Sequence, residues 1–178
     1  MRSQISGFTL LELMVTIVVL VVLLGIGVPS YMSFREDRIL AGVAQTLYGD
    51  ISYARSEAIK RHSDEMFIVF FTDDGTDWCY RISDNPECTA CDAACDIDGD
   101  GTTRGADVSQ FSGIQLPDVP YAEGKIRFSS RRGLTSEGDV IFEFGTSGKR
   151  LAVHTSALGR ASICAPTGSL YTGVQACN

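Results

Sequence analysis

Histidine is scarce in this 178-residue chain, which contains only His62 and His154. The sequence also lacks the G-x-S-x-G motif of serine hydrolases, the H-E-x-x-H motif of zinc peptidases and any glycine-rich phosphate loop. Acid–base and nucleophilic catalysis depend on groups of these kinds. Their absence predicts that the chain is not an enzyme, and His154, in a strand-like run, is expected to be structural.

Positive charge is nearly absent from the middle of the chain. Residues 63–124 contain two Lys or Arg against fourteen Asp or Glu, a net −12, whereas residues 1–62 have a net +1 and residues 125–178 a net +4. Such an acidic segment disfavours nucleic acid and suits a hard cation such as Ca²⁺. The basic final third keeps DNA open as a less favoured partner, through a phosphate-binding patch formed by Arg131, Arg132, Lys149, Arg150 and Arg160.

Charge is also rare in the first thirty residues, where only Arg2 and Glu12 are ionised. Phe8–Val28 reads FTLLELMVTIVVLVVLLGIGV, and as a helix it would be about 30 Å long, the thickness of a bilayer core. Arg2 precedes this run and favours a cytoplasmic N-terminus. No A-x-A-like site follows the run, which argues against a conventional cleaved signal peptide. We therefore predict a single membrane-spanning helix with the rest of the chain outside the cytoplasm.

Glu12 is the exceptional residue of the apolar run. A carboxylate in this position costs about 2.5–3.5 kcal/mol on membrane-insertion scales, so it needs a role or a partner. An ammonium group from a neighbouring chain would meet that need, because the attraction between opposite charges grows as water is excluded.

The segment Gly7-Phe8-Thr9-Leu10-Leu11-Glu12-Leu13-Met14-Val15 resembles the prepilin peptidase recognition site of type IV pilins and type II secretion pseudopilins. The resemblance implies cleavage after Gly7, N-methylation of Phe8, and pairing of Glu12 with the terminal amine of a neighbouring pilin subunit. It also implies a protein of the bacterial inner membrane that later joins an extracellular or periplasmic filament.

The same resemblance divides the chain into four parts. They are a leader at residues 1–7 removed by prepilin peptidase, a transmembrane and filament-core helix at 8–29, an amphipathic helix at 30–62, and a globular β-rich head at 63–178.

The pattern along the chain supports an α+β pilin fold, in which one long N-terminal helix packs on an antiparallel sheet. Apolar residues beyond Tyr31 recur at helical spacing: Leu40, Val43, Ala44, Leu47, Ile51, Ala54 and Ala58. We predict one helix from about Thr9 to Lys60, bent near Pro29. Strands are predicted at Met66–Thr72, Trp78–Ile82, Lys125–Ser129, Val140–Phe144, Arg150–His154 and Ala161–Ala165.

Two further segments, Ala54–Arg61 and Gly159–Cys177, resemble minor pilins and pseudopilins of the FimT, FimU and GspH group, whereas residues 84–120 have no counterpart there. The resemblance implies a minor pilin of a type IV pilus that acts in assembly, initiation or at the tip. A type II secretion pseudopilin and a FimT-like DNA-uptake pilin are the alternatives. The Gly-Arg-x-Arg motif of the DNA-uptake group is incomplete here, because Ser162 stands at its second arginine.

Six cysteines follow the apolar segment: Cys79, Cys88, Cys91, Cys95, Cys164 and Cys177. An even number beyond a membrane segment indicates disulfides, and free thiols or a zinc site built on Cys88-x-x-Cys91 are the alternatives. The pilin resemblance implies a bond between Cys164 and Cys177. The pairing of the other four stays open.

The segment from Asp96 to Asp107 has the spacing of an EF-hand calcium loop, with Asp at position 12 as in dockerin repeats, which it resembles. An exposed acidic turn is the alternative. The predicted Ca²⁺ ligands are Asp96, Asp98, Asp100, the Thr102 carbonyl and Asp107.

Overall fold

The computed structural model describes residues 9–61, 66–85, 88–91, 95–97 and 103–177. The chain has two compact units, Met1–Glu36 and Asp37–Asn178. Apart from Thr9, the described part of the first unit belongs to helix α1 (Leu10–Arg61), which continues into the second unit. Every residue from Leu10 to Arg35 is exposed, as expected for an apolar helix whose packing partners are lipid or other subunits.

The second unit contains the packed half of α1. All seven residues predicted to form its apolar face are buried: Leu40, Val43, Ala44, Leu47, Ile51, Ala54 and Ala58. Their spacing follows the helical repeat, so they share one stripe, and they join a single core with residues from the strands. The prediction of a long helix packed on antiparallel strands, and thus of the α+β pilin fold class, is confirmed.

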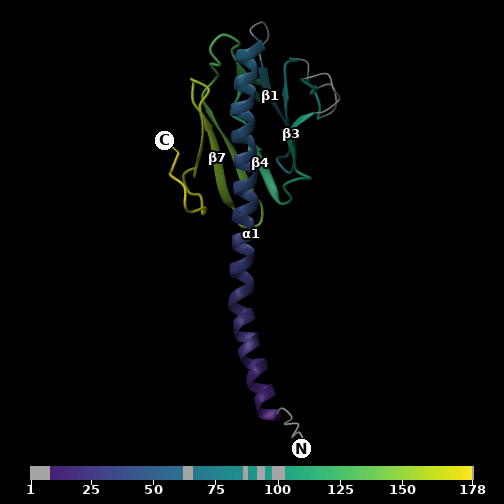
Figure 1. The fold of residues 1–178 in the computed structure, drawn as a ribbon, viewed down its shortest axis with the longest axis vertical. Coiled ribbons are helices and arrows are strands. Elements are labelled where there is room, and N and C mark those ends of the chain that lie inside the picture. The colour runs from purple at the N-terminus through teal and green to yellow at the C-terminus, as the bar shows by residue number, and fades with distance from the viewer. Residues whose placement is uncertain (1–8, 62–65, 86–87, 92–94, 98–102, 178) are drawn as a thin grey trace, which may run out of the picture. The chain divides into compact units, whose positions relative to one another are not determined.

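Two four-stranded antiparallel sheets are found among the described residues (Figure 1). Sheet A has the order β3-β2-β1-β5 and is made of β1 (Met66–Asp73), β2 (Asp77–Ser83), β3 (Arg104–Asp107) and β5 (Lys125–Phe128). Sheet B has the order β4-β6-β7-β8 and is made of β4 (Ile114–Asp118), β6 (Gly138–Phe144), β7 (Lys149–Thr155) and β8 (Ala161–Cys164). A short 3-10 helix, η2 (Ala122–Gly124), precedes β5.

Trp78 joins the two sheets. Its indole Nε1 donates a 2.9 Å hydrogen bond to the Ile114 carbonyl, and its ring lies 5.5 Å from that of Phe142, centroid to centroid. Within the second unit, α1 crosses the strands, with β3 on one side of it and β7 and the C-terminal loop on the other (Figure 1). The helix and both sheets therefore bury one common core.

The six predicted strands are present, with ends that differ from the prediction by at most two residues. Strands β3 and β4 were not predicted, nor was the division into two sheets. β3 needs a glycine in its centre, because a Cβ on Gly105 would clash with the Tyr80 carbonyl on β2. The pairing of β3 with β2 thus depends on a close approach of the two backbones, which the local hydrophobic pattern does not predict.

Candidate functional site

The exposed apolar part of α1 is the first candidate surface. Among the described residues α1 is the one helix long and apolar enough to cross a membrane, with a mean hydropathy of 2.8 in its most apolar window. Its start is capped: the backbone N–H of Glu12 donates a 3.2 Å hydrogen bond to the hydroxyl of Thr9. Thr9-x-x-Glu12 is the spacing of a capping box, and an acidic group in the first turn also favours the helix dipole. The sequence analysis predicted only intermolecular pairing for Glu12 and missed its position in this cap. The predicted processing residues, Gly7 and Phe8, lie outside the described residues.

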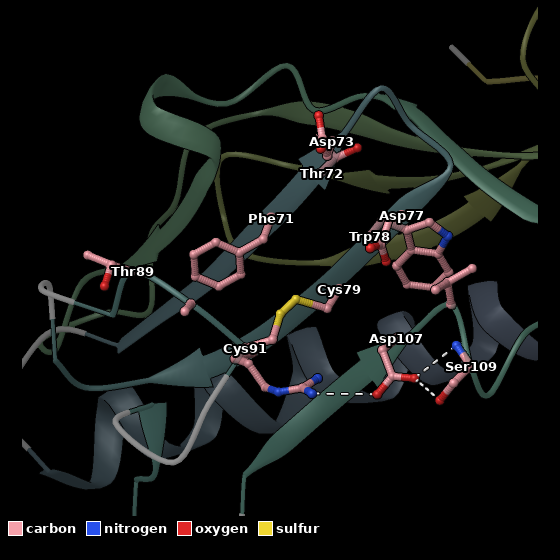
Figure 2. A pocket seen from close by; sticks show the side chains of 13 residues that line it. Phe71, Thr72, Asp73, Asp77, Trp78, Cys79, Thr89, Cys91, Asp107 and Ser109 are labelled. Atoms are coloured by element: carbon pink, nitrogen blue, oxygen red, sulfur yellow. Dashed lines mark hydrogen bonds and ion pairs between the residues drawn. A yellow bond between two sulfur atoms is a disulfide. The ribbon is translucent and has the colours of Figure 1, made fainter.

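A cleft on the outer face of sheet A is the second candidate. Successive residues of a strand point to opposite faces, so Phe71, Cys79 and Asp107, which are paired across β1, β2 and β3, share the face turned away from α1. Thr89 to Cys91 lie over this face and enclose a cavity of about 570 Å³. Figure 2 shows Phe71 and the Cys79–Cys91 disulfide beside the cavity, and Asp107 with Ser109 at one end.

Arg81 forms the base of this cleft and is buried, with 8% of its surface exposed. Its Nη1 donates to the carbonyls of Tyr80 at 2.9 Å and Ala106 at 3.2 Å, while Nη2 lies 3.5 Å from Oδ2 of Asp107. Ser109 donates to Oδ1 of Asp107 through both its backbone N–H and its hydroxyl (Figure 2). The hydroxyl of Ser109 is the main reason that the pKa of Asp107 lies below its ordinary value. An arginine within an otherwise apolar strand was the sequence signal for this site, and it was missed.

Three disulfides connect the six cysteines. Cys79 pairs with Cys91, Cys88 with Cys95, and Cys164 with Cys177, the last being the pair that the pilin resemblance implied. The zinc alternative at Cys88 and Cys91 is excluded, because the two thiols belong to different disulfides. Cys88 and Cys95 also pack against Phe67 and Val69 on the outer face of sheet A. The disulfides therefore hold Cys88, Cys91 and Cys95 against that face.

The predicted calcium ligands fall largely outside the part of the chain that the structure describes. This applies to Asp98, Asp100 and Thr102. Of the two described ligands, Asp96 precedes this gap and Asp107 ends β3, where Arg81 and Ser109 already contact its carboxylate. Within the described ranges no three His, Cys, Asp or Glu side chains are placed to hold a metal ion. The calcium site stays a prediction.

A basic cleft lies between α1 and the end of sheet B. Its lining includes Arg55, His154 and Arg160, and its volume is about 570 Å³. Arg55 contacts the turn at Gly133, and the turn at Gly159 meets the Gly133 carbonyl, so these two turns lie next to each other. We call the three exposed arginines that these turns carry the arginine cluster: Arg131, Arg132 and Arg160.

The other members of the predicted basic patch have internal partners. Lys149 Nζ lies 2.8 Å from Oδ1 of Asp37 on α1, and Arg150 Nη2 donates to the Thr167 carbonyl at 3.0 Å. His154 Nδ1 lies 2.7 Å from Oδ1 of Asp139 on the neighbouring strand, in keeping with a structural histidine. The basic patch is therefore smaller than predicted.

Comparison with known families gives two matches. A family model described as type II transport protein GspH covers residues 43–159, and a prokaryotic N-terminal methylation motif covers residues 2–28. A long helix on antiparallel strands, with a methylation motif that extends into its N-terminal part, defines a type IV pilin or pseudopilin. The chain belongs within that class to the GspH family, whose members are structural subunits. No curated protein and no solved structure gives a significant match.

Proposed function

We propose that the chain is a minor structural subunit of a type IV pilus, acting in assembly, initiation or at the tip. Prepilin peptidase cleaves it after Gly7, Phe8 is methylated, and α1 anchors it in the inner membrane with the N-terminus in the cytoplasm until it enters the filament. The observation that carries this proposal is the exposed apolar helix with one acidic residue, Glu12, in its first turn.

The physical argument rests on what such a surface needs. Large apolar side chains from Leu10 to Val28 are about half exposed or more, which is unfavourable in water. A bilayer covers them before assembly, and neighbouring helices cover them in a filament. Glu12 is costly in either apolar setting unless a cation meets it, and the amine of Phe8 in an adjacent subunit is such a cation.

Glu12 has two candidate roles that mutation can separate. Glu12→Gln keeps a side chain suited to the capping box but removes the charge, whereas Thr9→Val removes the cap and keeps the charge. If Glu12 pairs with an amine, the Gln variant is processed and membrane-inserted but nearly absent from sheared filaments, and the Val variant is incorporated close to wild type. If the Gln variant assembles normally, the charge has no part in assembly.

A pseudopilin of type II secretion is the second candidate, and the match to the type II transport protein GspH family favours it. The two systems differ in the final location of the protein. Recovery in surface filaments sheared from cells, with normal protein secretion after gene deletion, supports the pilus. Retention in the cell envelope together with a secretion defect supports the alternative.

A further inference from the structure

The acidic rim of the sheet A cleft comes from the tip of the β1–β2 hairpin. Asp73 and Asp77 are directly paired in the register, so their side chains leave the same face, one row beyond Phe71 and Cys79. Both residues are exposed and both line the cleft. Figure 2 shows Asp73 and Asp77 on the hairpin, with Phe71 further along β1.

This arrangement leaves a local charge imbalance. Like charges directly opposite each other on neighbouring strands destabilise a sheet. In the part of the chain that the structure describes, no Lys or Arg lies within ion-pair distance of Asp73 or Asp77. Arg81 in the same cleft already contacts Asp107 and two carbonyls. The rim therefore suits a cation with an apolar stem, which Phe71 and the Cys79–Cys91 disulfide would cover.

The arginine cluster has the complementary chemistry. Arg131 and Arg132 are adjacent and exposed on the tight turn after β5, which the Gly133 N–H closes by donating to the Ser129 carbonyl at 2.7 Å. Among the described residues, no carboxylate lies within ion-pair distance of either. A guanidinium matches a carboxylate in two parallel hydrogen bonds, and a cavity of about 570 Å³ accommodates the side chains of such a turn.

We propose that the acidic cleft of one subunit receives the Arg131–Arg132 turn of a second copy of this chain. Arg131 and Arg132 meet Asp73 and Asp77, and their methylene stems lie against Phe71. The cleft and the turn are different surfaces of one subunit, so the contact is heterologous and joins one copy head to tail with the next. The inference rests on the proposed filament function, for which it supplies a contact between heads in addition to that between helices.

Mixing two variants tests the proposal. Full-length chains are purified in detergent, and their association is followed by sedimentation velocity. Asp73→Asn/Asp77→Asn disables only the cleft and Arg131→Gln/Arg132→Gln disables only the turn, because each removes the charge of one surface without reversing it. We expect wild type to form a series of oligomers, with an association constant that falls about tenfold between about 50 and about 500 mM NaCl.

Each variant alone is expected to lose this salt-sensitive association, at least about tenfold in the association constant, because it lacks one surface. A mixture of the two variants retains one intact cleft and one intact turn, so it forms dimers and nothing larger. Asp118→Asn/Glu123→Gln, which makes the same change in charge at exposed sites outside the cleft, behaves as wild type.

Two results would overturn the proposal. The first is normal self-association of either variant, and the second is failure of the mixture to form dimers although both variants keep the wild-type fluorescence of Trp78. Binding of a synthetic tetra-arginine peptide to the cleft would not rescue the proposal if the mixture still fails to form dimers. Processing at Gly7 and recovery in sheared filaments are measured on the same variants, so failure of this contact is distinguished from failure of the filament function.

Discussion

The hydroxyl of Tyr80 donates a 2.8 Å hydrogen bond to Oδ2 of Asp50 and thereby joins β2 to α1 inside the head. Tyr80 is fully buried and Asp50 mostly so. Burial is the main cause that raises the pKa of Asp50, and the hydrogen bond from Tyr80 opposes it. Burial likewise raises the pKa of Tyr80, so the phenol stays protonated as a donor.

Tyr80→Phe is expected to lower the free energy of unfolding by about 1–2 kcal/mol, because it leaves the Asp50 carboxylate without this donor. Urea unfolding followed by fluorescence of Trp78, the single tryptophan, measures the loss. Tyr48→Phe is the matched control, since Tyr48 lies on α1 and is 43% exposed. Equal stability of the two variants would mean that the bond contributes nothing.

Asp50 should also make the stability depend on pH. Its pKa is raised in the folded state, so its contribution to stability is fully present below the unfolded value of about 3.8 and is lost as pH rises through the folded value. Asp50→Asn removes that dependence and keeps an acceptor for Tyr80. We expect the variant to gain stability relative to wild type between pH 4 and pH 7. An unfolding free-energy difference that is flat with pH, or that changes in the opposite direction, contradicts this reading.

Removal of the Cys88–Cys95 disulfide should destabilise the head more than removal of Cys164–Cys177. Loop entropy alone favours the reverse order, since the sequence separations are 7 and 13, but that difference is only about 0.5 kcal/mol. The Cys88–Cys95 pair covers Phe67 and Val69, and burial of each such side chain contributes about 1.5–3 kcal/mol. Urea unfolding of the two double Cys→Ala variants compares them, and a larger loss for Cys164→Ala/Cys177→Ala would show that the cover is energetically unimportant.

We propose that the segment from Asp96 to Asp107 binds Ca²⁺ with a dissociation constant of about 10⁻⁴–10⁻³ M, and Mg²⁺ poorly. Asp107 is an unsuitable residue for the test, because its loss also disturbs Arg81 and Ser109. Asp96→Ala/Asp98→Ala is the informative variant, with Asp118→Ala as control. Calorimetry should detect heat of binding, and Ca²⁺ should raise the melting temperature, for wild type and control only. If wild type, the double variant and the control all show no heat of binding and no change in melting temperature up to millimolar Ca²⁺, the loop is an acidic turn.

Double-stranded DNA should bind only weakly, with a salt dependence that corresponds to few phosphates. The residues to mutate are those of the arginine cluster, because Lys149 and Arg150, the other members of the predicted phosphate-binding patch, have internal partners. Arg131→Ala/Arg132→Ala/Arg160→Ala should remove most of what binding there is, as measured by fluorescence anisotropy against salt. Tight binding at physiological salt that this variant abolishes would favour a role in DNA uptake.

The sequence was sufficient where local periodicity decides the structure. The spacing from Leu40 to Ala58 identified every buried residue of α1, and the runs Met66–Thr72 and Trp78–Ile82 identified strands β1 and β2. These elements follow from which side chains share a face.

The sequence was insufficient where contacts between distant segments determine the structure. β3 is four residues long and β4 contains Pro117, so neither has a clear strand pattern, and both depend on a partner strand. The pairing of Cys79 with Cys91 has the same origin, because cysteine spacing allows many pairings. The cleft with Arg81 emerges only once β2, β3 and the Cys91 segment are brought together.

The mature N-terminus of the filament-borne protein tests the central claim most directly. Cleavage between Gly7 and Phe8 leaves 178 minus 7, or 171 residues, and N-methylation adds about 14 Da. We predict that mass spectrometry of sheared filaments finds the chain beginning at methylated Phe8, with the apolar part of α1 intact. A terminus at or beyond Gly27 would identify a conventional signal peptide, remove the helix on which assembly depends, and contradict the account.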